Sequence, residues 1–144
     1  MKKTKFNLKI LSIAILVIAA FTLIKIVGEL IFGEINTAVL PEGAPENLLL
    51  ITKIFIASFS FILLLPQIYL GIKGLWAVNH PRSSRFHVIV AIVLFALTLV
   101  TIVSPITAIV KKENILYNVA GICSIIIQLF LYFEYARNAK ELAR

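Results

Sequence analysis

Three ionisable side chains lie within or beside long apolar stretches, where a charge needs a chemical reason. Lys25 and Glu29 are four residues apart in one stretch, and Lys53 borders the next. Residues four apart lie on the same face of a helix, so Lys25 and Glu29 have the spacing of an ion pair. Because a charge is costly to place in an apolar segment, such residues mark a functional site by default, and here they predict a polar pocket.

A second group combines helix-disturbing prolines with amides inside apolar stretches: Pro66, Gln67, Pro105 and Gln128. A proline removes one backbone hydrogen bond from a helix, so Pro66 and Pro105 predict bends or hinges. A buried glutamine either serves a functional site or forms a hydrogen bond with a neighbouring helix, and the sequence leaves both interpretations of Gln67 open. These four residues form the candidate interior site and hinge.

The apolar stretches that must position these residues are long enough to be membrane-spanning helices. Residues 54–72 contain no charged residue, and at about 1.5 Å per residue they can cross a hydrocarbon core of about 30 Å. The whole chain is 60% hydrophobic and 15% charged, whereas a soluble domain is typically about 45–50% apolar and about 25% charged. Four helices are therefore predicted, over about residues 7–33, 48–76, 86–110 and 115–136.

The lysines and arginines are distributed unevenly over the two sides of the predicted bundle. In an up-down-up-down arrangement, ten of them fall on the side of the termini and four on the other side. The ten are Lys2, Lys3, Lys5, Lys9, Lys73, Arg82, Arg85, Arg137, Lys140 and Arg144, and the four are Lys25, Lys53, Lys111 and Lys112. Basic residues are in excess on the cytoplasmic side of membrane proteins, so both termini are predicted to be cytoplasmic. The sequence thus predicts one all-α domain over residues 1–144, an integral membrane four-helix bundle in a cell membrane, with anionic lipids at its cytoplasmic face.

In this topology the charged residues of the first two helices lie near the outer surface. Lys25, Glu29 and Lys53 come from these helices, and Asn118 lies at a similar depth at the start of the last one. Together they predict an outward-facing polar pocket. In an alternative interpretation the two lysines extend to the outer headgroups and Glu29 only neutralises them.

Small and polar residues recur at helical spacing along each predicted helix, as expected at helix–helix interfaces in lipid. They predict four inward-facing stripes and hence a compact bundle, with most large apolar side chains facing lipid. The stripes are Ser12, Ala19, Thr22, Lys25 or Ile26, Glu29 and Gly33; Ser60, Gln67, Gly71 and Gly74; Ala91, Thr98, Thr101 and Pro105; and Asn118, Gly121, Ser124, Gln128 and Tyr135.

Residue patterns that carry a recognised reaction are absent from the sequence, so no enzyme activity and no cofactor is expected. His80 and His87 are seven residues apart, which is not metal-ligand spacing, and the single Cys123 excludes an intrachain disulfide and a cysteine-only metal site. The net charge of +7 is explained by membrane topology, and no aromatic-interleaved basic patch indicates a nucleic-acid partner.

The segment PQIYLGIKGLWAVNHPRSSRFH, from Pro66 to His87, resembles a recurrent pattern in small multi-pass membrane proteins of bacteria. In that pattern a GIKGL-type helix end leads through a Pro-Ser-Ser-type turn to a histidine at the start of the next helix. Residues 66–140 fit it, about half of the chain. That family has no assigned activity, so the resemblance implies a multi-pass topology in a bacterial plasma membrane and no particular chemistry.

The pair Pro66 and Gln67, followed by a basic helix end and two more helices, also resembles PQ-loop transporters, the small SemiSWEET-type sugar carriers, over about residues 50–137. This resemblance implies that Pro66 is a hinge for alternating access and that Asn118 contacts a sugar. The chain departs from the family by an extra N-terminal helix and by the lack of a tryptophan in the third helix.

Two functions remain open from the sequence. The first is that of a non-enzymatic accessory, protective or partner-binding membrane protein, acting with a second copy of itself or with another membrane protein. The alternative is a small PQ-loop-like solute transporter with a polar interior pocket.

Overall fold

A computed structural model describes residues 2–32, 43, 45–81, 85–112 and 114–144, and for Glu29 and Ile56 it describes the backbone alone. The described residues form five helices and no strand. The helices are α1 (Lys2–Phe32), α2 (Glu46–Asn79), α3 (Phe86–Thr101), α4 (Val103–Val110) and α5 (Ile115–Leu142). The prediction of an all-α chain is confirmed for this part of the molecule.

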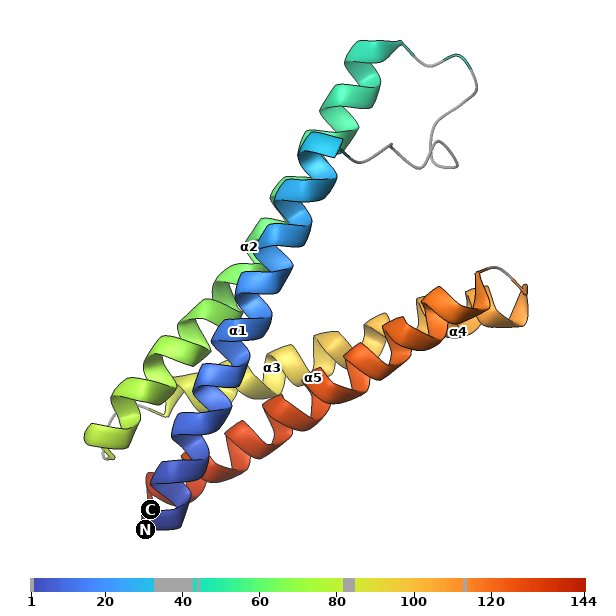
Figure 1. Cartoon of the computed structure of the whole chain (residues 1–144). Coiled ribbons are helices and arrows are strands. Elements are labelled where there is room, and N and C mark those ends of the chain that lie inside the picture. Colours follow the sequence, from blue (N-terminus) through green and yellow to red (C-terminus); the bar gives the residue numbers. More distant parts are fainter. Residues whose placement is uncertain (1, 33–42, 44, 82–84, 113) are drawn as a thin grey trace.

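The helices form two arms that meet at one end and diverge toward the other (Figure 1). In the first arm α1 packs along α2, and in the second arm α3 and α4 pack along α5. The N- and C-termini lie close together at the end where the arms meet, which we call the shared end (Figure 1). Contacts of α1 with α5 and of α2 with α3 join the two arms.

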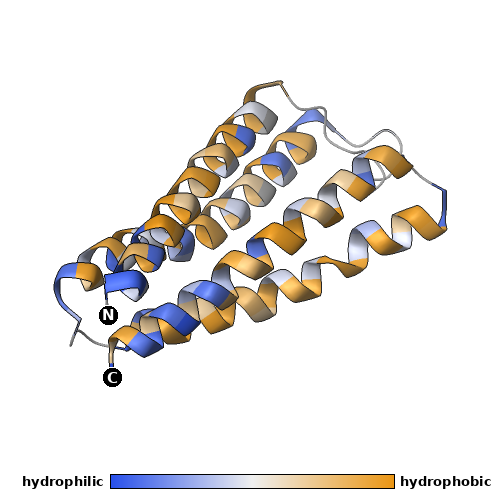
Figure 2. Cartoon of the chain, turned by 60° about the horizontal axis from the view of Figure 1, so that its bottom comes forward, coloured by the Kyte–Doolittle hydropathy of each residue, from blue (hydrophilic) through white to orange (hydrophobic). Residues whose placement is uncertain are grey.

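Four helical segments are long and apolar enough to cross a membrane: Lys2–Phe32, Glu46–Asn79, Phe86–Val110 and Ile115–Leu142. Hydrophobic residues predominate along these helices, and many of the hydrophilic ones lie close to the two termini (Figure 2). The four segments match the predicted spans in number and in order along the chain.

The third predicted helix is divided in two, because α3 ends at Thr101 and α4 begins at Val103. Pro105 has no N–H group, so the carbonyl of Thr101 cannot receive its usual helical hydrogen bond. The Ile102 N–H lies 3.4 Å from the Leu99 carbonyl oxygen, a bond over three residues instead of four. Pro105 thus coincides with a real interruption, whereas α2 runs through Pro66 from Glu46 to Asn79.

The helices also extend farther than predicted at the shared end. The sequence predicts a start near residue 7 for the first helix and an end near Ala136 for the last, but α1 begins at Lys2 and α5 ends at Leu142. Asn138, Ala139 and Leu142 are buried, so the end of α5 belongs to the packed part of the protein instead of a charged tail. Tertiary packing of this kind is the main source of helix stability in proteins.

Burial is concentrated near the shared end. All described buried side chains of α2 and α5 lie in the half of each helix nearer that end. In α3 the buried residues are His87, Ala91 and, just past the middle of the helix, Leu94, whereas α1 has two farther along, Ala19 and Ile26. The main core cluster consists of Leu8, Ile15, Leu70, Ala77, Ala91, Leu94, Tyr132, Tyr135, Ala139 and Leu142. The stripes predict a compact bundle, but the described helices are packed in this way only near the shared end, because the arms separate beyond the core (Figure 1).

Candidate functional site

The polar side chains that are fully buried lie where the arms meet, and we call this region the junction. Ser12, His87 and Asn138 are the buried polar residues of the described part, and Tyr132 and Tyr135 are buried beside them. They come from α1, α3 and α5, and α2 contributes two buried glycines to the same place. The junction therefore contains residues of the first, second, third and fifth helices.

Gly74 allows three helices to approach one another closely. A Cβ atom at this position would collide with the Ser12 hydroxyl of α1, and it would lie 2.6 Å from Cε2 and 2.9 Å from the hydroxyl oxygen of Tyr135 in α5. A Cβ atom at Gly71 would collide with the Leu16 side chain of α1. Glycine is the residue that permits such close backbone approach, which is how small residues mediate helix packing in lipid.

Tyr135 links the second arm to the first through a hydrogen bond. Its hydroxyl donates to the Leu70 carbonyl oxygen of α2 over 3.0 Å, and both groups are buried. The His87 ring of α3 stands edge-on to the Tyr135 ring, with the centroids 6.1 Å apart and the planes at 86°. Ser12 donates to the Leu8 carbonyl oxygen within α1 over 2.7 Å. Tyr135 is thus the side chain on which α2, α3 and α5 converge.

Gln67 lies one helical turn from Leu70 on α2 and within hydrogen-bonding reach of Tyr132. Its Oε1 atom is buried and has no hydrogen-bond partner among the described residues. A buried acceptor without a partner costs about 1–3 kcal/mol. Among the described residues, this is the one buried side-chain nitrogen or oxygen atom without a hydrogen-bond partner.

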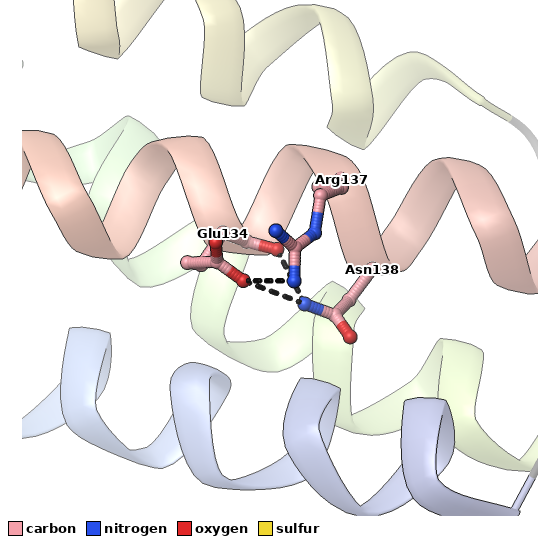
Figure 3. Close-up of polar contacts among 3 residues, drawn as sticks. All are labelled: Glu134, Arg137 and Asn138. Atoms are coloured by element: carbon pink, nitrogen blue, oxygen red, sulfur yellow. Dashed lines mark hydrogen bonds and ion pairs between the residues drawn. The ribbon is translucent and has the colours of Figure 1, made fainter.

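A small polar cluster on α5 borders the junction (Figure 3). Glu134 Oε2 lies 3.0 Å from Arg137 Nη2, and Asn138 Nδ2 donates to the Glu134 carbonyl oxygen over 2.8 Å and to Oε2 over 3.4 Å. All three residues lie within one helical turn, so the cluster compensates the Glu134 carboxylate without help from another helix.

The four residues of the predicted outward pocket do not come together as one group. Lys25 and Lys53 belong to the first arm, whereas Asn118 is in the first turn of α5 in the second arm, and the arms diverge in this direction (Figure 1). Asn118 Nδ2 donates to the Asn114 carbonyl oxygen over 3.2 Å. The Glu29 side chain lies outside the described residues, so its pairing with Lys25 stays a prediction.

The candidate interior and hinge residues also separate. Gln67 is at the junction, but Gln128 Nε2 is bound over 3.5 Å to Ser124 Oγ, one turn earlier on its own helix. Pro66 and Pro105 lie in different arms. Of the predicted stripes, Ser12, Ala19, Gly71, Gly74, Ala91 and Tyr135 are buried, whereas Thr101 and Ser124 are exposed.

Three buried residues of the junction are not in the predicted sites: His87, Tyr132 and Asn138. A signal for the α5 residues is present, since positions 132, 135, 139 and 142 follow the alternating three- and four-residue spacing of a packed helix face. The charged residues around them hide this pattern. His87 lies four residues before Ala91 and so on the face of the predicted stripe, but it directly follows a turn, where a histidine is usually solvated.

Metal binding finds no support in the described residues, which contain no group of three or more His, Cys, Asp or Glu side chains that could hold an ion. Cys123 is a free, exposed cysteine. The chain was also compared with models of protein families, with characterised proteins and with solved structures, and none of them matches. The two resemblances noted in the sequence therefore rest on their own residues.

Proposed function

We propose that the chain is a multi-pass protein of a cell membrane, with up-down-up-down helices and both termini in the cytoplasm. Its four long apolar helices support this, because in the most apolar windows of α2 and α5 only 6% of the residues are buried by the protein itself. Apolar surface on this scale needs lipid or other protein to cover it. The excess of basic residues at the shared end supports the cytoplasmic placement of the termini.

Within that membrane we propose a non-enzymatic, partner-binding role, as an accessory or protective protein. The observation that carries it is the separation of the arms: outside the junction, the described α5 side chains and most of those of α2 are not buried. These outer halves offer surface to a second copy of the chain or to another membrane protein. The junction fixes the two arms relative to each other, which preorganises this surface for a partner.

Site-specific photo-crosslinking tests this role. A photoreactive residue replaces Phe59 in the first arm or Phe130 in the second arm, both exposed outside the junction, in the full-length protein in its native membrane. A discrete protein–protein product at one of these positions is expected. The same residue placed at Phe6, which is also exposed but near the N-terminus, is the control. Adducts with lipid alone at both arm positions would contradict the partner-binding role.

A solute transporter is the second candidate, and one observation favours it. The buried Oε1 of Gln67 lacks a hydrogen-bond partner among the described residues and adjoins Pro66, the proposed hinge. Uptake by proteoliposomes separates the two functions. Solute movement that is lost in both Gln67→Leu and Asn118→Leu would favour the transporter, whereas no movement of any tested sugar favours the accessory role.

A further inference from the structure

Two side chains contact Trp76 near the shared end: Lys73 of α2, and His80, which directly follows the last residue of α2. Lys73 Nζ lies 4.7 Å from the centroid of the Trp76 ring. The His80 ring stacks on the Trp76 ring, with the ring centroids 4.4 Å apart and the planes at 18°. His80 Nδ1 also lies 3.2 Å from the Trp76 carbonyl oxygen. These residues form one continuous cationic and aromatic surface, which we call the α2 strip.

Two residues of the α2 strip are exposed and Lys73 is half-buried, although the helix is otherwise suited to the membrane interior. Trp76 is 45% exposed, His80 is exposed, and α2 ends one residue before it at Asn79. Tryptophan in a membrane-spanning helix prefers the level where acyl chains meet headgroups, because its ring is apolar and its N–H is a hydrogen-bond donor. The strip therefore lies at the lipid–water boundary of the shared end.

The charge of Lys73 is not balanced by a carboxylate in the part of the chain that the structure describes. Among the described residues no carboxylate forms an ion pair with it, and this side of the predicted bundle carries ten basic residues but only two acidic ones, Glu134 and Glu141. Glu134 is already bound to Arg137. A lysine above an aromatic ring keeps N–H donors that can bind an anion, so the strip is complementary to a negatively charged group beside an apolar one.

We propose that the α2 strip binds the headgroup of an anionic phospholipid from the leaflet at the shared end. Lys73 binds the phosphate, the acyl chains lie along the exposed Trp76 ring, and the His80 imidazole is the second polar contact. A free phosphate ion or an acidic peptide would use the cation but leave the exposed indole uncovered, whereas a phospholipid engages both. This site rests on the proposed membrane location of the chain.

Trp76 is the single tryptophan of the chain, so its fluorescence reports on this site alone. The full-length protein is reconstituted into phosphatidylcholine vesicles that contain increasing fractions of acyl-brominated phosphatidylglycerol or of acyl-brominated phosphatidylcholine. Bromine quenches a neighbouring indole. One lysine close to an anionic lipid corresponds to a preference of about five-fold, and we expect the anionic lipid to quench more strongly by this factor.

Variants assign the preference to the strip. Lys73→Gln is expected to equalise quenching by the two lipids, whereas Lys73→Arg retains the preference because it keeps the charge and the stacking. Lys140→Gln, an exposed lysine in the last turn of α5, is the matched control and also retains it. Equal quenching in the unchanged protein, or an unaltered preference in Lys73→Gln, would overturn the lipid site while leaving the membrane location intact. No quenching by either brominated lipid would instead contradict the membrane location itself.

Discussion

Gly74→Ala is the most informative single substitution, because it adds one methyl group where α1, α2 and α5 meet. The new Cβ would collide with the Ser12 hydroxyl and would lie 2.6 Å from Cε2 of Tyr135, a ring that is 0% exposed and held by its hydrogen bond to Leu70. The Ser12 hydroxyl is held by its hydrogen bond to the Leu8 carbonyl oxygen, and rotating it away would still leave the new Cβ against the buried Tyr135 ring. The helices must therefore move apart or the tyrosine must leave its place.

The magnitude follows from three contributions. Overpacking a well-packed core costs about 1–3 kcal/mol, and loss of the Tyr135 hydrogen bond costs about 1 kcal/mol. Alanine is a better helix former than glycine by about 1 kcal/mol, which offsets the second contribution. We expect Gly74→Ala to lower the free energy of unfolding by about 1–3 kcal/mol.

Thermal or denaturant unfolding of the detergent-solubilised protein measures this change. Gly121→Ala is the matched control, because a Cβ atom there would meet nothing within 4 Å, so it should leave stability unchanged or raise it by up to about 1 kcal/mol. Adding Ser12→Ala to Gly74→Ala removes the closest obstacle and should recover part of the loss. If Gly74→Ala is as stable as Gly121→Ala, the close approach at the junction is refuted.

Three further predictions concern other contacts. Tyr135→Phe removes only the hydroxyl that binds Leu70 and should destabilise the protein by about 1 kcal/mol, whereas Tyr117→Phe, at a side chain that is 71% exposed, should be silent in the same unfolding assay. Leu142→Ala should cost about 2–3 kcal/mol if the end of α5 is part of the core, and a change near zero would show that this end is a tail. Glu29→Gln should destabilise more than the combination of Lys25→Met with Glu29→Leu, because a lone charge in an apolar segment is worse than none. Melting points unaffected by each of these charge changes would show that the lysine extends to the headgroups instead.

The sequence was sufficient for the helices because the signals that define them are long and local. Each span is an apolar run bounded by charges, prolines or glycines, and length alone identifies it. Stripe residues near the shared end, such as Ser12 and Gly74, were also predicted correctly, since small residues mark close helix contacts. The ends of α1 and α5 are not predicted correctly, because the local sequence there is charged and packing against other helices determines where each helix ends.

The arrangement of the arms was beyond the sequence for a different reason. In lipid the hydrophobic effect does not favour apolar contacts between helices over contacts with acyl chains. Composition therefore does not reveal over what part of their length the two arms stay packed against each other. The sequence groups Asn118 with Lys25 by depth in the membrane alone, and depth does not fix which arm a residue lies in or how far apart the arms are. Tyr135, by contrast, was predicted to face inward, but its contact with Leu70 depends on the angle between the arms.

The central claim, a membrane protein whose termini share the cytoplasmic side, is tested most directly by cysteine accessibility in intact cells. In a Cys123→Ser background, one cysteine is placed at Gly43, between α1 and α2, and another, in a separate variant, at Lys140 near the end of α5. A membrane-impermeant thiol reagent is expected to label the Gly43 variant directly and the Lys140 variant only after the membrane is opened. Labelling of Gly43 from the cytoplasmic side alone, or direct labelling of Lys140, would contradict the account.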